Sequence, residues 1–533
     1  QASRQSCGGT RLLCSLLMVE PAWLASRSHR RLAGALFILS LLAPSRSLRE
    51  LLGSFMRGLE IPVAATWPPR SRGVVSMLGA RATRAEALRV ARGETPAGTV
   101  GELQQKHLFA LNLRGVAGAH AFVPRSYYVP RAGDLREAAD EKAIFEQDFM
   151  LSQAAMILRR ASGQDRGEIS DNVMQLSVAC QACKRYLEGE KMPWVSDDEW
   201  ALLAKGCSSV GRPTSEAENC EQLRIEASRI LQELQESSPE LQLQLLHRNI
   251  WILKPSTGAL GRGIRFLTGI SASRDFIATE PKKENRPSTE ALGNVIQKYI
   301  ERPDLIRLLY VDAPSADSPY TACEESGSDE GEAFKYNIRV WLNVLWCQEL
   351  PEAWFFEDGY LEFADKPYTD DVEVQTAHIS NLGETQLERG GRVSPWGWTT
   401  ERYRSHLLAR TGSDVYAHQI LPAMKSAASA ALGSIRPASS EGGEGKARWK
   451  RFGLDFTVDQ DLNAWLIEIN YNPGMSSHRS RRGDMKRALV KEFFQSEVSL
   501  RAWCAEERSS DDAGPRFGFV PLEVQNWRLP ANP

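Results

Sequence analysis

The chain has 533 residues, of which 42% are hydrophobic and 25% charged, and its formal net charge is −2. These values are those of a soluble globular protein with room for about two to four structural units. The nearly balanced charge gives no electrostatic reason to expect nucleic acid or an anionic membrane as the main partner.

The nine cysteines are odd in number and scattered along the chain. We therefore expect no disulfide framework, and a reducing compartment fits better. Cys180 and Cys183 form one C-x-x-C, but a zinc site would need a second close pair, which the sequence lacks. We interpret both residues as plain thiols.

Residues 1–98 are rich in Arg, Ser, Ala and Gly, a bias that favours disorder. The apolar run from Leu32 to Leu42 follows several basic residues and resembles the core of a signal peptide. It lies deep in the chain and is too short to span a bilayer. We predict a low-complexity, disordered N-terminal extension and no stable membrane insertion.

Ordered structure is expected to begin near Val100. Leu108 to Leu113 has the apolar pattern of a buried strand, and Phe122 to Tyr128 that of a second extended segment. Amphipathic helices are predicted from Asp134 to Arg160 and from Glu216 to Gln235, as packing scaffold rather than site.

The segment from Asn249 to Ile270 has the pattern of a strand, a glycine-rich turn and a second strand. Glycines in such a turn can adopt positive φ and bring backbone N–H groups close to an anion, and two basic side chains add positive charge. The pattern matches neither a Walker A loop nor a dinucleotide-binding loop, so an ordinary glycine hairpin also fits. The residues concerned are Lys254, Gly258, Gly261, Arg262 and Gly263.

Further strands are predicted at Val295 to Ile300, Lys335 to Trp346 and Trp354 to Phe363. In the second of these, alternation places Lys335, Asn337 and Arg339 on one face, opposite Tyr336 and the apolar residues. Residues 312–332 are acidic and rich in Ser and Gly, which predicts a disordered surface insertion. Glu401 to Leu432 is predicted to be largely helical.

Two strands near the end of the chain carry acidic residues between apolar ones. Phe452 to Val458 contains Asp455, and Trp465 to Asn470 contains Glu468. In a hairpin these residues and Asn470 lie within reach of one another, and two carboxylates with an amide oxygen suit Mg²⁺. The alternative is an acid neutralised by a nearby lysine or arginine.

Together and in this order, these motifs resemble the tubulin tyrosine ligase-like family of ATP-grasp ligases. The resemblance covers most of Val100 to about Phe494. It is closest to the tubulin glycylases, through HRNIWILKPSTGALGRGI at 247–264 and VIQKYIERPDLI at 295–306. It implies an α+β fold in which two α/β subdomains grip ATP, with a smaller N-terminal α/β domain. The implied domains are the extension 1–98, an ATP-grasp domain 99–498 and a C-terminal tail 499–533.

The resemblance also implies a role for individual residues. Lys106 and Lys254 would hold ATP phosphates, and Gly261, Arg262 and Gly263 would close over them. The adenine-gripping linker would be Gln297, Lys298, Tyr299 and Ile300. The phosphate and acyl-phosphate region would be lined by Lys335, Arg339, His378 and Asn381, with Lys335 and Arg339 catalytic. Mg²⁺ would be held by Asp455, Glu468 and Asn470.

The implied reaction is ATP-dependent amide formation between free glycine and glutamate side chains of tubulin tails. A monomer that acts on microtubules in the cytoplasm, the cytoskeleton and the axoneme of a cilium or flagellum is implied as well. This chain has Leu260 and Glu362 where the family usually has arginine, and Asn337 where it usually has aspartate. Three alternatives stay open: a glutamylase, a tyrosine ligase, or a catalytically silent microtubule-binding relative.

Overall fold

The computed structural model describes residues 106–522 with gaps. The gaps are 115, 130–134, 165–172, 191–195, 205–216, 257–260, 262, 270–292, 310–323, 326–330, 347–351, 381–397, 435–447, 472, 474–482 and 506–517. The predicted N-terminal extension therefore lies outside the described residues, as does most of the acidic insertion.

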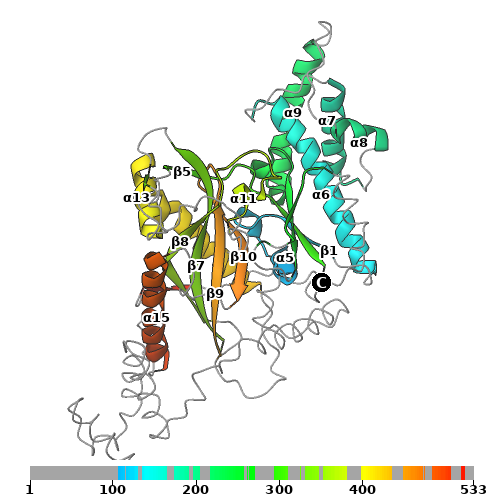
Figure 1. The fold of residues 1–533 in the computed structure, drawn as a ribbon. Coiled ribbons are helices and arrows are strands. Elements are labelled where there is room, and N and C mark those ends of the chain that lie inside the picture. The colour runs from blue at the N-terminus through cyan, green and yellow to red at the C-terminus, as the bar shows by residue number, and fades with distance from the viewer. Residues whose placement is uncertain are drawn as a thin grey trace, which may run out of the picture. The chain divides into compact units, whose positions relative to one another are not determined.

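One antiparallel sheet of four strands is covered by a helical layer (Figure 1). Its strand order is β1 (Ser126–Val129), β4 (Asn294–Lys298), β2 (Trp251–Pro255) and β3 (Arg265–Leu267). The helices are α6 (Leu135–Ala161), α7 (Val173–Leu187), α8 (Asp197–Ala204) and α9 (Ala217–Ser237). They share one apolar core with the sheet, in which Trp251 of β2 is fully buried against Phe145 of α6.

The second sheet is larger and also antiparallel. Its central strands are β7 (Glu332–Trp346) and β9 (Arg448–Val458), and β8 (Glu352–Phe363) pairs with β7. The other strands are β10 (Ala464–Tyr471), β5 (Leu305–Leu309), β6 (Glu324–Glu325) and β11 (Phe519–Leu522). The two sheets and the helices packed on them make a mixed helix-and-sheet fold.

Each face of the second sheet has its own apolar cover. One face packs against α5 (Lys106–Arg114), α13 (Thr400–Thr411), the π-helical turn η8 (Tyr416–Ile420) and α14 (Leu421–Gly433). The alternation predicted for β7 is confirmed, because Tyr336, Ile338 and Val340 lie in this core. On the other face, α15 (Gly483–Ala505) packs on Trp341 and Phe356 and leaves the rest of that face for polar residues.

Most predicted elements are confirmed: the helices α6 and α9, the helical region α13 to α14, and the strands β2, β3, β4, β7, β8, β9 and β10. The predicted strand from Leu108 to Leu113 is wrong, because this segment is the helix α5. Phe109, Ala110 and Leu113 are buried while Leu111 and Asn112 are only half-buried, which is helical rather than alternating spacing. Short apolar runs do not distinguish the two on their own.

Two other expectations need correction. Glu324 and Glu325 of the predicted disordered insertion pair with Leu309 and Leu308 of β5. Within the predicted C-terminal tail 499–533, α15 continues to Ala505 and β11 pairs with β8. The extended segment predicted from Phe122 shrinks to β1, which begins at Ser126.

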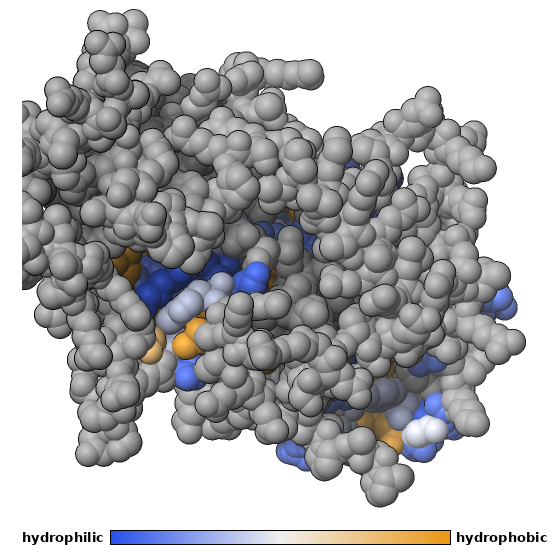
Figure 2. Space-filling model, turned by 90° about the horizontal axis from the view of Figure 1, so that it is seen from below, coloured by the Kyte–Doolittle hydropathy of each residue, from blue (hydrophilic) through white to orange (hydrophobic). Residues whose placement is uncertain are grey.

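None of the helices in the described residues is long and apolar enough to cross a membrane. On the face seen from below, hydrophilic side chains predominate in the visible described surface, with smaller hydrophobic areas among them (Figure 2).

Candidate functional site

A polar face on the second sheet carries five of the predicted site residues: Lys335, Arg339, Asp455, Glu468 and Asn470. Strand register sets their positions in two rows across the sheet. One row runs from Tyr360 through Arg339 and Asp455 to Glu468. The neighbouring row includes Glu362, Asn337 and Thr457. Residues far apart in the sequence are thereby placed side by side on four adjacent strands.

A β-bulge in β10 determines which way Glu468 points. The register shifts between Leu466 and Glu468, so that Leu466 pairs with Phe456 and Glu468 pairs with Asp455. Ile467 is the extra residue. The bulge lets Leu466 and Ile469 both enter the apolar core while Glu468 stays on the face of Asp455.

Asp455 is held by an arginine in this structure. Arg339 donates from Nε to Oδ1 and from Nη2 to Oδ2, the second at 2.7 Å, and Asn470 Nδ2 donates to Oδ2 at 3.0 Å. Burial raises the pKa of Asp455 to about 6, opposed by Arg339 and assisted by the charges of Glu362 and Glu468. The structure therefore brings together all three residues predicted to hold Mg²⁺, and it gives Asp455 a cationic partner in Arg339.

Two lysines, one on the first sheet and one on α5, lie near the acidic residues. Lys254 at the end of β2 is buried and donates to Gln297 Oε1 at 2.7 Å and to the carbonyl oxygen of Ile467 at 3.4 Å. Lys106 Nζ at the start of α5 lies 3.7 Å from Glu468 Oε1. Burial lowers the pKa of Lys254 to about 8, and the charge of Lys106 contributes to the lowering while Glu468 opposes it.

A third lysine lies beside an aromatic cluster. Lys335 Nζ donates to Tyr299 Oη at 3.1 Å and to the carbonyl oxygen of His378 at 3.0 Å. Tyr299 Oη and His378 Nδ1 are 2.9 Å apart, and Phe266 packs edge-on against both rings. Burial, with a smaller effect from Lys254, lowers the pKa of Lys335 to about 7, and burial lowers that of His378 to about 4.

These side chains surround a small cavity of about 50 Å³ between the two sheets. Its lining joins residues of the first sheet to residues of the second. From the first sheet and its linker come Ile252, Lys254, Ile264, Gln297, Lys298, Tyr299 and Ile300; the rest are Lys335, Asn337, His378, Ile379, Ser380, Thr457, Ile467 and Glu468. A second, smaller cavity of about 10 Å³ lies beside Lys106, Lys254 and Glu468.

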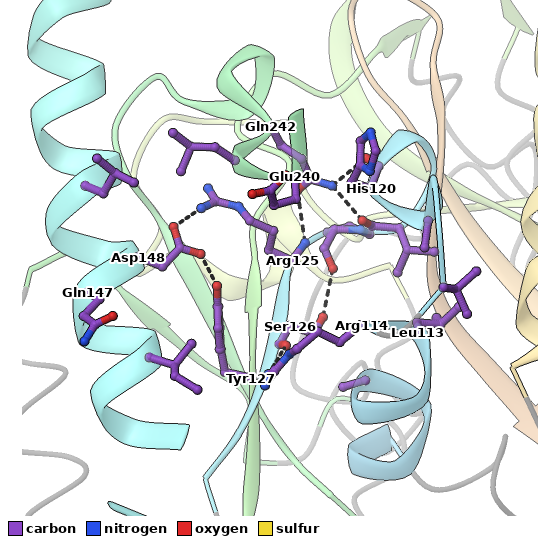
Figure 3. A pocket seen from close by; sticks show the side chains of 18 of the residues that line it. Leu113, Arg114, His120, Arg125, Ser126, Tyr127, Gln147, Asp148, Glu240 and Gln242 are labelled. Carbon is purple, nitrogen blue, oxygen red and sulfur yellow. Dashed lines mark hydrogen bonds and ion pairs between the residues drawn. The ribbon is translucent and has the colours of Figure 1, made fainter. Parts of the chain in front are cut away.

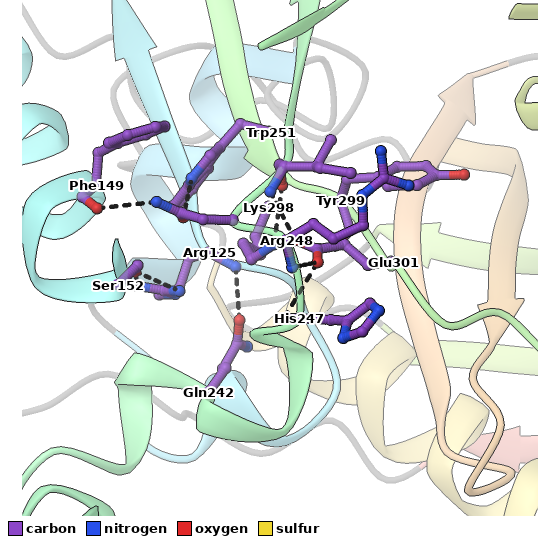
Figure 4. Close-up of polar contacts among 12 residues, drawn as sticks. Arg125, Phe149, Ser152, Gln242, His247, Arg248, Trp251, Lys298, Tyr299 and Glu301 are labelled. Carbon is purple, nitrogen blue, oxygen red and sulfur yellow. Dashed lines mark hydrogen bonds and ion pairs between the residues drawn. The ribbon is translucent and has the colours of Figure 1, made fainter. Parts of the chain in front are cut away.

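The side chain of Lys298 has a different surrounding from the one expected for a nucleotide contact. Its fully buried Nζ donates to the carbonyl oxygen of Ile250 and pairs with Glu301 over the ring of Trp251 (Figure 4). Glu301 also accepts from the backbone N–H groups of His247, Arg248 and Ile250. The ammonium group of Lys298 thus holds the start of β2 in place.

The glycine turn is described in part. Gly261 and Gly263 have φ of 69° and 75°, which favours glycine, and a Cβ on Gly263 would lie 2.8 Å from Pro255 Cγ. Arg262 of the turn and Asn381 of the HISN segment lie outside the described residues.

Sequence reasoning missed two features near the site. One is the hydrogen bond from Thr457 Oγ1 to Asn337 Oδ1 at 2.6 Å, which depends on strand pairing. The other is a larger cavity of about 350 Å³ between α5, β1 and α6 (Figure 3). On its wall Asp148 accepts hydrogen bonds from Arg125 and Tyr127, and Gln242 Oε1 accepts one from the backbone N–H of Arg125.

Comparisons with known proteins match a family and several relatives. The model of the tubulin-tyrosine ligase family matches residues 195–502. The chain is 26% identical over 422 residues to the tubulin monoglycylase TTLL3 of Mus musculus, which covers 70% of this chain and 41% of that protein. It is 25% identical over 412 residues to human tubulin monoglycylase TTLL3, with 69% and 48% covered. Against the protein monoglycylase TTLL8 of Mus musculus, identity is 25% over 423 residues, with 68% and 45% covered. The chain thus spans somewhat less than half the length of these relatives.

Proposed function

Because the chain belongs to the tubulin-tyrosine ligase family, we propose that it is an ATP-dependent ligase that joins glycine to glutamate side chains of tubulin tails. In this proposal the two sheets are the two halves of an ATP-grasp fold, within a domain that extends from 99 to about 498. Relatives named tubulin monoglycylases support glycine and tubulin as the substrates.

The observation that carries the proposal is the cavity between the sheets. Lys254 and Lys335 reach it from opposite walls, and Glu468 lies at its edge. Cations on two walls suit a polyphosphate, because each can compensate negative charge that would otherwise be buried. Tyr299, Ile252 and Ile264 supply an apolar surface suited to a nucleobase. The backbone of the linker 297–300 lines the same cavity, so we assign the adenine contact there and not to the Lys298 ammonium group.

The cavity is small for this task. Ligand pockets usually measure about 300–1,000 Å³, against about 50 Å³ here. We therefore propose that nucleotide binding moves the two sheets apart.

The chemistry of the acidic residues suits a magnesium ion. Asp455 and Glu468 face each other across paired strands, and the Asn470 amide donates its N–H to Asp455. Carboxylate and amide oxygens are the ligands that Mg²⁺ prefers. When bound here with ATP, the ion would neutralise charge on the transferring phosphoryl group. For Asp455 to join such a site, Arg339 has to release at least one of its oxygens.

The chain's own residues then have separate tasks. Lys106, Lys254 and Lys335 hold the phosphates of ATP while the acceptor carboxylate takes its terminal phosphoryl group, leaving ADP. The ammonium group of glycine first gives a proton to water. The neutral amine nitrogen then attacks the activated acyl carbon, the new C–N bond forms, the C–O bond to phosphate breaks, and inorganic phosphate and a second proton leave. Arg339, once released from Asp455, stabilises the negative charge of the tetrahedral intermediate.

One observation favours a second function. The bidentate pair between Arg339 and Asp455 gives each residue a partner within the chain, which fits a catalytically silent, microtubule-binding relative. A glutamylase or a tyrosine ligase would share the nucleotide site and differ in the amino acid that it adds.

The proposed partner is tubulin in microtubules, and the proposed place of action is the cytoskeleton and the axoneme. The enzyme is proposed to act as a monomer.

The test is direct. The purified chain is incubated with ATP, Mg²⁺, tubulin and radiolabelled glycine, glutamate or tyrosine in parallel. ATP-dependent incorporation of glycine alone supports the proposal, and incorporation of another amino acid reassigns it within the family. If tubulin binds and no amino acid is incorporated, the protein is a catalytically silent, microtubule-binding member of the family.

A further inference from the structure

A chain of three hydrogen bonds leads from the first strand of the fold to the ammonium group of Lys254. Lys254 Nζ donates to Gln297 Oε1 at 2.7 Å, and Gln297 Nε2 donates to Ser126 Oγ at 3.1 Å. Ser126 Oγ in turn donates to the carbonyl oxygen of Pro124 at 2.9 Å. Lys254 and Gln297 are buried and line the nucleotide cavity, whereas Ser126 lies one residue further from it.

Strand register brings the three side chains to one face of the first sheet. Ser126 of β1 pairs with Gln297 of β4, and Gln297 pairs with Ile252 of β2, two residues before Lys254. Side chains at such a diagonal offset are about 7–8 Å apart, within reach of a lysine and a glutamine. Trp251 points to the helical layer, and Lys254 reaches the second sheet, so the chain of hydrogen bonds lies on the face towards that sheet.

The chemistry of these groups determines the direction of each hydrogen bond. An ammonium group has only donors, so the Gln297 amide has to present its oxygen to Lys254 and its NH₂ group to Ser126. The Ser126 hydroxyl then accepts, and its own hydrogen goes to the Pro124 carbonyl. A rotated amide would direct an N–H group against the ammonium group. The Ser126 oxygen therefore holds the Gln297 amide in the orientation that Lys254 requires.

The acceptor that Gln297 offers to Lys254 is neutral, which leaves the charge of the lysine available for phosphate. Of the three ammonium hydrogens, one goes to Gln297 and a second to the carbonyl oxygen of Ile467 at 3.4 Å, so one remains for a ligand. The ion pair of Glu468 is made with Lys106, and among the described residues the structure shows none for Lys254.

We propose that Ser126 is a positioning residue, which acts through Gln297 to orient the ammonium group of Lys254 towards the phosphates of the nucleotide. The inference rests on the proposed function and deepens it, because it names what holds the phosphate-binding lysine in place. It also gives Gln297 two separate tasks. Its backbone borders the proposed adenine region, and its side chain orients Lys254.

The experiment is a double-mutant cycle on the affinity for ATP, measured by calorimetry with neither glycine nor tubulin present. Ser126→Ala should raise the Kd for ATP about 3- to 10-fold, the size of one hydrogen bond. Lys254→Met should raise it about 10- to 100-fold, the size of one hydrogen bond to a charged group. In the double variant the Kd should stay within about twofold of that of Lys254→Met, because Ser126 acts only through the lysine. A merely structural role of Ser126 would add the same loss in both backgrounds.

Two substitutions of matched shape test whether the hydroxyl is the group that matters. Ser126→Thr keeps the hydroxyl and should bind ATP within about twofold of wild type, whereas Ser126→Val has the same shape and should lose as much as Ser126→Ala. This pair carries the test if Ser126→Ala does not fold.

Ser152→Ala is the control for the loss of a buried hydroxyl. Ser152 of α6 accepts from Arg125 and donates to Asp148, and it contacts neither Gln297 nor Lys254. Its affinity for ATP should stay within about twofold of wild type. Thermal unfolding of every variant shows whether each is folded.

The outcomes separate this inference from the proposed function. A loss in Ser126→Ala that disappears in the Lys254→Met background supports the inference. Equal losses in both backgrounds overturn it, and so does a Kd in Ser126→Ala equal to that of wild type or a loss in Ser126→Thr as large as in Ser126→Val. If wild type binds no ATP, the proposed function and the inference fail together. If wild type binds ATP and adds no glycine to tubulin, only the proposed ligation fails, because the affinity for ATP is measured without the acceptor.

Discussion

Asp455 of β9 lies directly opposite Glu468 of β10, and this pairing exists only because the register shifts at Ile467. Regular alternation from the Leu466–Phe456 pair would place Glu468 opposite Leu454, on the apolar side of the sheet. The bulge keeps two apolar residues in the core and turns the acid back to the polar face. The predicted metal site thus depends on one extra residue in one strand.

Replacing Glu468 with Gln should reduce ligation by at least about 100-fold, which corresponds to about 2.7 kcal/mol in the transition state. The side chain keeps its size, so the melting temperature should change little. Initial rates at saturating Mg²⁺ are the measurement. Asp461→Asn, at an exposed acid in the turn between β9 and β10, is the control. Wild-type turnover in Glu468→Gln would show that this residue holds no catalytic metal.

Nucleotide binding should be accompanied by proton uptake near pH 8. Burial lowers the pKa of Lys254 to about 8 and that of Lys335 to about 7, so both lysines are partly neutral there in the empty protein. Bound phosphates favour the charged form and raise both pKa values. Calorimetry in two buffers of different ionisation enthalpy measures the protons taken up. The uptake should shrink in Lys335→Met, and an equal uptake in that variant would place Lys335 away from the nucleotide.

The same two lysines determine whether the free energy of unfolding rises or falls with pH. Their folded pKa values are below the unfolded value, so the unfolded chain binds more protons between about pH 7 and pH 10. The cost of burying them is fully present below about pH 7, and it is relieved as pH rises. In Lys335→Met the free energy of unfolding should therefore rise less steeply over pH 7 to 9 than in wild type. Identical slopes in chemical denaturation would contradict this account.

Glu301→Gln should lower the free energy of unfolding by about 3–5 kcal/mol, because it leaves the buried Lys298 without a counter-charge. Three backbone N–H groups at the start of β2 also donate to the Glu301 carboxylate. Denaturant titration measures the loss. Glu373→Gln, at an exposed acid near α11 (Gln375–His378), serves as the control. A loss below about 1 kcal/mol, the size expected of a surface pair, would mean that the pair is solvated.

Asn343→Leu should stabilise the protein. Asn343 of β7 is fully buried, and within the described part of the chain neither atom of its amide has a hydrogen-bond partner. Removing such a group regains about 1–3 kcal/mol of desolvation cost. Asn337→Leu on the same strand should instead destabilise, since Asn337 accepts a hydrogen bond from buried Thr457. Chemical denaturation of both variants is the check, and a destabilised Asn343→Leu protein would point to a polar partner for the amide.

The local pattern of the sequence was enough to predict most of the long strands of the second sheet. Strict alternation in β7 separates Lys335, Asn337 and Arg339 from the apolar face, because successive side chains of a strand point to opposite sides. Glu468 stands out for a similar reason, since an acid between Ile467 and Ile469 is costly to bury unless its charge is compensated. The segment after Lys106 illustrates the limit of such patterns, because Leu108 to Leu113 was predicted as a strand and belongs to the helix α5.

Other features were decided by tertiary structure alone. Lys298 sits among predicted nucleotide contacts in the sequence, yet its ammonium group turns to Glu301, because a buried charge takes the nearest available partner. The Arg339–Asp455 pair joins residues 116 positions apart, and the bulge at Ile467 lets Leu466 and Ile469 enter the same core. Sequence periodicity determines which face a residue belongs to. Only strand register and packing, which depend on contacts between distant segments, decide which partner that residue meets.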